Sequence, residues 1–216
     1  LDPNVPPNLC VPGKAEVAAV VAKLTGKVAE ATEPKYAHIK CRGGNGIAKL
    51  AYEYKGVHDC AAAKIVQQGP KFCKFGCLGF GNCTRACPFG AMSMGENGLP
   101  VVNKTLCTGC GKCASVCPNH VIELLPISAK VSISCSSKDF GAPAMKNCKA
   151  LCLGCGSCMR NCSHQEEGAI KIIDHLAVVN QDICHTCDNA TCLTKCPTGA
   201  INEMIKGSFK KEENVG

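Results

Sequence analysis

Apolar residues recur at helical spacing close to the start of the chain, between Lys14 and Glu30. The residues that share one face of a helix with this period are Val17, Val20, Val21, Leu24 and Val28. Three- and four-residue spacing of this kind indicates an amphipathic helix. We therefore predict a helix over residues 14–30. We expect its apolar face to pack against its own domain rather than against a membrane or a partner.

The other apolar stretches are too short for helices of ordinary length. Residues 91–103 are predicted to form a hairpin, because Gly-Glu-Asn-Gly separates two apolar stretches. Residues 169–180 repeat this design with Asp174 and His175 at the turn. Single strands are predicted at residues 36–41, 121–126, 131–135 and 200–205. The first and third of these strands each end in a cysteine.

The composition offers little from which to build a hydrophobic core. The 216 residues hold 21 cysteines but no tryptophan, only three tyrosines and six phenylalanines. Such a chain needs another source of stability, and disulfides, zinc and iron–sulfur clusters are the candidates. A signal peptide is not visible, and no apolar run approaches the roughly 18 residues of a membrane span. We expect the chain as given to be soluble.

Most of the cysteines lie in four runs, of which the second reads CTGCGKCASVCP, from Cys107 to Pro118. In a C-x2-C-x2-C-x3-C-P run, three thiolates hold three corners of one four-iron cube and the fourth ligates the other cluster of a pair. The first run is stretched between its second and third cysteines, the third has Ser163 in place of the proline, and the fourth is lengthened. Zinc favours two separated C-x2-C knuckles, and disulfide scaffolds suit small secreted proteins, so clusters are the preferred interpretation.

Assigning the last cysteine of each run to the other cluster of its pair gives four ligand sets. In the first pair, one cluster takes Cys73, Cys77, Cys83 and Cys117. Its partner takes Cys87, Cys107, Cys110 and Cys113. In the second pair, one cluster takes Cys152, Cys155, Cys158 and Cys196. The last takes Cys162, Cys184, Cys187 and Cys192.

Five cysteines remain outside the four runs. Four of them lie in two segments that resemble each other, one before each pair of runs, and we expect them to hold a fifth cluster: Cys41, Cys60, Cys135 and Cys148. The alternative is that they are buried free thiols. Cys10 is either an ordinary free thiol or the last ligand of a sixth cluster whose other cysteines lie upstream.

The cysteine runs are internally duplicated, since Cys107, Cys110 and Cys117 recur as Cys184, Cys187 and Cys196. The fold class that follows is α+β, with two bacterial-type 2[4Fe-4S] ferredoxin modules of short hairpins and short helices, and an N-terminal α/β extension. The expected divisions are residues 1–13 (end of an upstream cluster domain), 14–71 (extension), 72–125 (first module), 126–150 (connecting segment), 151–205 (second module) and 206–216 (charged tail).

The formal charge of +7 is no argument for nucleic-acid binding. Twenty thiolates around five dicationic four-iron cores would bring the charge to about −3, and no aromatic platform for bases is present. Basic residues that lie on or beside the runs would still form a positive rim for an acidic partner, or simply be scattered solvated charges. They are Lys71, Lys74, Lys104, Lys112, Lys146, Lys149 and Arg160.

The sequence resembles the B subunits of Rnf complexes, the ion-translocating ferredoxin:NAD oxidoreductases. The resemblance covers nearly the whole chain and rests on VHDCAAA, GPKFCKFGCLGFGNCTRACPFGAM, CTGCGKCASVCP, SCSSKDFGA and CKALCLGCGSCMRNC. It implies [4Fe-4S] clusters and a chain that accepts electrons from reduced, soluble, acidic ferredoxin. The chain would relay them to other subunits of a membrane translocase, without a bond-making site of its own.

The same resemblance implies a location on the cytoplasmic side of the membrane. Such subunits have an N-terminal membrane anchor and a small four-cysteine domain, and NLCVPG (residues 8–13) is similar to the end of that domain. The chain given lacks the anchor and the other cysteines of that domain. Two alternatives share every cluster motif, namely a free-standing soluble polyferredoxin and the electron-input subunit of another reductase.

Overall fold

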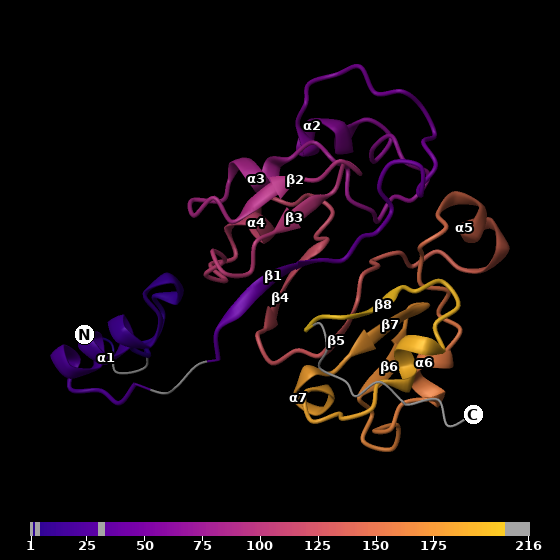
Figure 1. Cartoon of the computed structure of the whole chain (residues 1–216). Coiled ribbons are helices and arrows are strands. Elements are labelled where there is room, and N and C mark those ends of the chain that lie inside the picture. Colours follow the sequence, from indigo (N-terminus) through magenta and orange to yellow (C-terminus); the bar gives the residue numbers. More distant parts are fainter. Residues whose placement is uncertain (1, 3–4, 30–32, 206–216) are drawn as a thin grey trace.

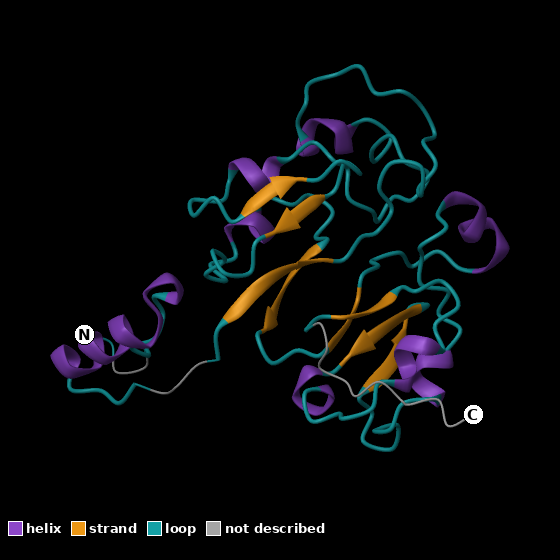
Figure 2. Cartoon of the chain, viewed as in Figure 1, coloured by secondary structure: helices purple, strands orange, loops and turns teal. Residues whose placement is uncertain are grey.

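Four two-stranded antiparallel sheets organise the part of the chain that the computed structural model describes, residues 2, 5–29 and 33–205. Loops join these sheets to short helices, and the loops make up much of the molecule (Figure 2). The strands are β1 (Lys35–Ile39), β2 (Met92–Met94), β3 (Pro100–Val102), β4 (Ile122–Pro126), β5 (Val131–Ile133), β6 (Ile170–Ile173), β7 (Leu176–Val179) and β8 (Ile201–Glu203). The predicted α+β class is confirmed.

The helices within the described ranges are mostly one or two turns long. They are η1 (Val11–Gly13), α1 (Lys14–Thr25), α2 (Cys60–Ile65), α3 (Asn82–Arg85), α4 (Lys112–Ser115), α5 (Gly141–Asn147), α6 (Ser157–Arg160), α7 (Gln181–Cys184) and α8 (Thr191–Thr194). Helices this short are not stable alone, so packing and any bound group must hold them in place.

Both predicted hairpins are confirmed. Strand β2 pairs with β3, and β6 pairs with β7. At the second turn Asp174 and His175 have φ values of 49° and 62°, which are left-handed. Two consecutive left-handed residues characterise the tight turn whose twist matches that of its strands.

The remaining strands pair over long distances in the sequence. Strand β1 pairs with β4, with Tyr36 opposite Leu125, and β5 pairs with β8, with Ile133 opposite Ile201. Each half of the molecule therefore has one hairpin and one long-range strand pair, and the two halves lie side by side in Figure 1. The sequence predicted the strands but not these partners. The divisions expected within the chain stay a prediction.

Strand β5 joins the two halves, because each of its faces packs against a different half. Along VSISC the apolar side chains belong to the core of the second half, and the serines between them are buried against the first half. Ser132 Oγ donates to Glu123 Oε1 over 3.1 Å, and Ser136 Oγ, beyond the strand, donates to the carbonyl oxygen of Lys40 over 2.9 Å. Because a strand alternates its faces, one short segment serves both a core and an interface.

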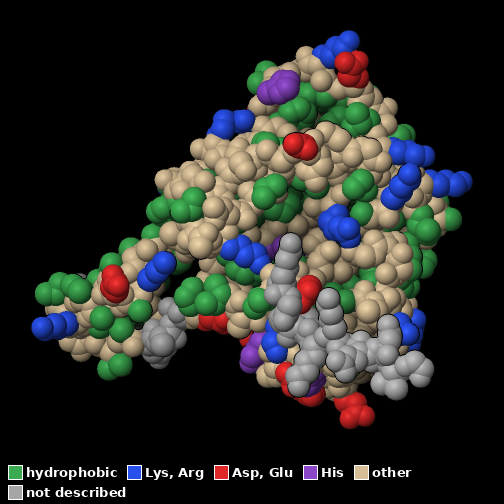
Figure 3. Space-filling model, in the orientation of Figure 1, with side chains coloured by type: hydrophobic (Ala, Val, Ile, Leu, Met, Phe, Trp, Pro, Cys, Tyr) green, Lys and Arg blue, Asp and Glu red, His purple; other side chains and the backbone are tan. Residues whose placement is uncertain are grey.

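Helix α1 differs from its prediction in length and packing. It begins at Lys14 as expected but ends at Thr25, because Gly26 adopts a left-handed φ of 68° and caps it. Glu30 lies outside the described residues. Alanines provide the buried side of this helix, whereas Leu24 is 79% exposed. The expectation that the valine and leucine face packs against its own domain is wrong, and Figure 3 shows this helix with green hydrophobic side chains on its surface.

Candidate metal centres

Five cavities within the described part of the chain are each lined by four cysteines, and the space within each, its open mouth included, is about 280 to 380 Å³. The N-distal cavity has Cys87, Cys107, Cys110 and Cys113. The N-proximal cavity has Cys60, Cys77, Cys83 and Cys117. The bridging cavity has Cys41, Cys73, Cys135 and Cys148. The C-proximal cavity has Cys152, Cys155, Cys158 and Cys196. The C-distal cavity has Cys162, Cys184, Cys187 and Cys192.

Three of these sets are the ones expected from the sequence, including the crossing of the last cysteine of each run. Cys87 joins the three thiols of the following run, and Cys117 joins the preceding one. Cys162 and Cys196 cross in the same way in the second half. The short helices explain the crossing, because a cysteine in the first turn and a cysteine just after the last turn face different cavities.

Left-handed glycines set the local geometry of the runs. Gly81, Gly111 and Gly156 precede α3, α4 and α6 with φ between 71° and 78°. Each turns the chain so that the second helical residue, a cysteine, is buried. Gly154, with φ of 62°, lies between two cysteines of the C-proximal cavity, and a Cβ there would stand 2.4 Å from the carbonyl oxygen of His175. Only glycine fits that position without strain.

The expected placement of Cys60 and Cys73 is wrong. The structure places Cys60 in the N-proximal cavity and Cys73 in the bridging cavity, which exchanges the two. The sequence CLGFGNC (residues 77–83) has the same length as CLGCGSC (residues 152–158), with Phe80 at the position of Cys155. The first run is therefore not a stretched copy of the motif. It has one thiol fewer than the third run at this position, and Cys60, from α2, is the fourth cysteine that lines the cavity.

A further signal for this exchange was present in the sequence. Cys73 lies four residues before Cys77, as Cys148 lies four residues before Cys152. Cys73 and Cys148 are thus equivalent, and both line the bridging cavity. The fifth set accordingly takes two thiols from each half, at matching places in the duplication.

A hydrogen-bond network fixes Cys60 beside Cys83. Asp59 caps α2 by accepting from the N–H of Ala62 at 2.9 Å, and its other carboxylate oxygen accepts from Asn82 Nδ2 at 2.6 Å. Asn82 Oδ1 accepts from the N–H of Cys60 at 3.0 Å. Asn82 is the residue before Cys83, so one amide side chain ties the two ligand helices together. Asp59 and Asn82 are not among the residues predicted from the sequence to support the site.

Lys71 was expected on an exposed positive rim, and this is also wrong. Its side chain is buried, with the residue only 7% exposed. Its Nζ donates to the carbonyl oxygens of Gly43 and Cys77, each at 2.7 Å. Lys71 lines the bridging cavity while Cys77 lines the N-proximal one. It is therefore an internal positive charge between two sets of thiols and cannot contact a partner.

Burial keeps many of these thiols neutral on their own. Burial, with a smaller contribution from neighbouring cysteines, raises the pKa of Cys77 and of Cys192 to about 12. It raises the pKa of Cys83, Cys135, Cys158 and Cys184 to about 11. Only a ligand that brings positive charge would make thiolates of them at neutral pH, as iron does when it displaces the protons.

Backbone N–H groups are directed at several sulfur atoms. The N–H of Ala37 donates to Cys107 Sγ over 3.4 Å, and that of Ser137 donates to Cys135 Sγ over the same distance. Burial raises the pKa of Cys196, but hydrogen bonds from residues 198, 200 and 201 outweigh this effect and leave the pKa below its usual value. Donors of this kind stabilise sulfur ligands that carry negative charge.

The donor sets fit [4Fe-4S] clusters. Each cavity offers one cysteine for each of four irons, and such clusters are held by four thiolates. Thr108 lines the N-distal cavity, and its buried hydroxyl has no hydrogen-bond partner among the described residues, so it is available to an anionic sulfur. Within that same described range, no three His, Cys, Asp or Glu side chains meet as a single metal ion would require.

Cys10 is exposed and lies outside all five cavities. Its role as a ligand stays a prediction. Across the described ranges, no helix has the length and apolar character needed to cross a membrane.

Comparison with known proteins gives one family match and several similar proteins. The family described as the 4Fe-4S dicluster domain matches residues 76–122, a range that begins after Cys73. The B subunit of the proton-translocating ferredoxin:NAD(+) oxidoreductase complex of Clostridium ljungdahlii is 52% identical over 214 residues, covering 99% of this chain and 74% of that protein.

Two further proteins are similar over most of the chain. The B subunit of the ion-translocating oxidoreductase complex of Methanosarcina acetivorans is 39% identical over 201 residues, 93% of this chain and 74% of that protein. The B subunit of the Na(+)-translocating ferredoxin:NAD(+) oxidoreductase complex of Acetobacterium woodii is 37% identical over 199 residues, 92% of this chain and 58% of that protein.

Proposed function

Because the chain belongs to the B subunits of the ion-translocating ferredoxin:NAD(+) oxidoreductase complexes, it is an iron–sulfur electron-relay subunit of such a complex, and we propose that it holds five [4Fe-4S] clusters in one continuous series. A [4Fe-4S] cluster, when bound, accepts and releases one electron at a low potential. The protein supplies the thiolates, excludes water from them and sets the order in which the sites adjoin.

Contacts between neighbouring cavities support the series. Within each half, one short segment delivers thiols to both cavities, as Cys83 in α3 and Cys87 just after it do. The N–H of Cys77, in the N-proximal cavity, donates to Cys41 Sγ, in the bridging cavity, over 3.3 Å. Leu151 lines the bridging cavity, and the next residue, Cys152, lines the C-proximal one. The order is therefore N-distal, N-proximal, bridging, C-proximal, C-distal.

We further propose reduced, acidic ferredoxin as the electron donor and the cytoplasmic side of the membrane as the location. The names of two relatives include ferredoxin and NAD(+) as the partners of their complexes. Lys112, Lys146, Lys149 and Arg160 are exposed near the cysteine runs, and Cys155 is the exposed thiol of the C-proximal cavity. Exposed positive charge of this kind would attract an acidic carrier to the surface near the runs.

The experiment that tests the proposal is the iron and acid-labile sulfide content of the chain, purified or reconstituted without oxygen. Five clusters give about 20 of each per chain. About 16 of each would confine the clusters to the four ferredoxin-type sites and leave the bridging cysteines as free thiols.

The donor is tested separately, by the rate at which reduced ferredoxin transfers electrons to the loaded chain. We expect the rate to fall steeply with added salt, because screening weakens attraction between opposite charges. A rate independent of ionic strength would contradict charge-steered docking without affecting the cluster count.

A further inference from the structure

The third cysteine run differs from the other three in the residue that follows its last cysteine. Pro88, Pro118 and Pro197 occupy this position elsewhere, and Ser163 occupies it here. Proline has neither a hydroxyl group nor a backbone N–H, whereas serine has both. One site of the five can therefore receive a hydrogen bond that this position cannot provide in the other runs.

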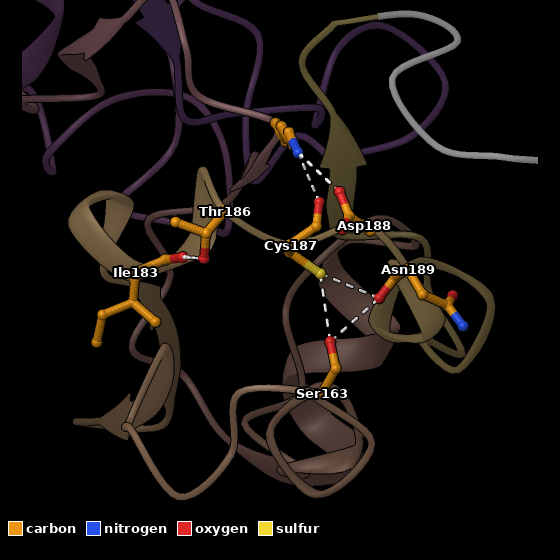
Figure 4. Close-up of polar contacts among 7 residues, drawn as sticks. Ser163, Ile183, Thr186, Cys187, Asp188 and Asn189 are labelled. Carbon is orange, nitrogen blue, oxygen red and sulfur yellow. Dashed lines mark hydrogen bonds and ion pairs between the residues drawn. The ribbon is translucent and has the colours of Figure 1, made fainter.

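Ser163 lies against a ligand loop of the C-distal cavity, as Figure 4 shows. Its Oγ stands 3.3 Å from Cys187 Sγ and donates to the carbonyl oxygen of Asn189 over 3.3 Å. The Cys187 thiol in turn donates to the same carbonyl oxygen over 3.0 Å. A cysteine that ligates iron is a thiolate without a proton, so it can only accept hydrogen bonds. The hydroxyl of Ser163 is then the donor of this pair, and the negatively charged sulfur competes for its proton with the neutral carbonyl oxygen of Asn189.

The backbone of this loop is held in place from the other side. Lys130 Nζ donates to the carbonyl oxygen of Cys187 over 2.7 Å and lies 3.8 Å from Asp188 Oδ1. This contact holds the backbone of the loop at Cys187, while Ser163 Oγ holds the same loop at Asn189. The hydroxyl and the sulfur are thus kept within hydrogen-bond distance by contacts that do not involve the sulfur itself.

We propose that Ser163 is a positioning residue whose hydroxyl donates to the Cys187 thiolate and raises the reduction potential of the C-distal site. This inference rests on the proposed function, since it concerns a cluster at that site. A hydrogen bond to a ligand sulfur withdraws negative charge and stabilises the reduced form, which carries one more electron. Ser163 is exposed, so water competes with its hydroxyl, and the expected effect is a modest shift.

Thr186 provides a matched control in the same loop. It precedes Cys187, but its hydroxyl donates to the carbonyl oxygen of Ile183 over 2.8 Å and not to a sulfur atom (Figure 4). Thr186→Val removes that hydroxyl while keeping the shape of the side chain. It therefore separates the loss of a hydroxyl near the loop from the loss of the bond to Cys187.

The test is a redox titration of the full, cluster-loaded chain, followed by electron paramagnetic resonance. In Ser163→Ala and in Ser163→Pro we expect the potential of one cluster to become more negative while the potentials of the others stay unchanged. In Ser163→Thr, which keeps a hydroxyl, all potentials should equal those of the wild type. Thr186→Val leaves every component in place. Iron and sulfide content is measured on each variant and stays at the wild-type value.

Three outcomes would overturn the proposal. Potentials unchanged in both Ser163→Ala and Ser163→Pro would show that the hydroxyl does not tune the site. An equal shift in Thr186→Val would assign the effect to loop packing. Loss of iron from both Ser163 variants would make the residue part of the construction of the site rather than its tuning. Failure of the proposed function is distinct, because it would leave the wild-type chain without iron and sulfide.

Discussion

The two halves of the chain follow one plan but complete their proximal cavities differently. In the second half, Cys155 completes the C-proximal cavity from within the run and is exposed. In the first half, Phe80 stands at that position, and Cys60 completes the N-proximal cavity from α2, where it is buried. A four-thiol site thus constrains the number and geometry of its ligands more than their order in the sequence. Because Cys60 lies on α2, the first half also places a helix at its proximal cavity.

The largest effect is expected at the bridging cavity, because both halves contribute thiols to it. Cys135→Ala removes one of its four thiols, and we expect iron to fall from about 20 to about 16 per chain. Electron transfer between the two halves should fall severely, because the middle site of the series is lost. Iron analysis and freeze-quench spectroscopy of each half measure the two effects.

Cys10→Ala is the control for this variant, since Cys10 is exposed and lines none of the five cavities. Its iron content should equal that of the wild type. If Cys135→Ala instead lost the clusters of the ferredoxin-type sites, the assignment of the bridging set would be wrong.

The origin of the fourth thiol in the first half can be exchanged. Cys60→Ala should lower the iron content by about four per chain, through loss of the N-proximal cluster. Phe80→Cys placed in the same chain puts a thiol at the position that Cys155 occupies in the second half, and we expect it to restore the content. Iron and sulfide analysis of the single and double variants decides the matter. If Phe80→Cys did not restore the iron content, the loops at residues 77–83 and 152–158 would match in sequence, but the side chain at position 80 would not point into the cavity as that of Cys155 does.

Lys71 distinguishes the interior of the first half from a charged surface. Lys71→Met leaves the carbonyl oxygens of Gly43 and Cys77 without their donor, at a cost of about 2 kcal/mol in the free energy of unfolding. Denaturant unfolding under anaerobic conditions measures the change. Lys74→Met is the control, because Lys74 is less buried and donates to the carbonyl oxygens of Gln67 and Gly69 in a single loop. Equal effects of the two substitutions would contradict the internal role of Lys71.

The smallest expected effect is at Asp59. Hydrogen bonds from the Ala62 N–H and the Asn82 side chain hold the pKa of Asp59 below its usual value, so its carboxylate is charged at neutral pH. Asp59→Ala removes the cap of α2 and one bond of the network beside Cys60. We expect a chelator to take iron from the N-proximal site a few-fold faster, with the other sites unchanged. A uniform acceleration at all sites would indicate general destabilisation instead.

The sequence predicted what depends on nearby residues. The two hairpins, the strands and the crossing of Cys87, Cys117, Cys162 and Cys196 all follow from patterns within a few tens of residues. Strand partners could not be predicted, because residues that pair, such as Tyr36 and Leu125, lie far apart in the sequence and no local pattern links them. Spacing alone also assigned Cys73 to the cluster of the first run, whereas Cys73 lines the bridging cavity.

Two further errors have physical causes that the pattern does not contain. The apolar stripe of α1 has the period of a packed helix, but periodicity does not identify what covers it, and Leu24 is exposed. Lys71 carries a charge that sequence reasoning assigns to the surface by default, whereas two carbonyl acceptors allow it to be buried. The alignment of Phe80 with Cys155 would have identified the missing thiol directly.

The composition of the bridging cavity has a consequence for how the protein matures. Cys41 and Cys73 leave the ribosome well before Cys135 and Cys148, and domains generally fold as they are synthesised, the N-terminal one first. The two early thiols cannot complete this site until the second half has been translated and docked. Under the proposed assignment of a cluster to the bridging cavity, delivery of iron to this site would report that synthesis is finished. A chain stopped early would then lack the site that connects the two halves.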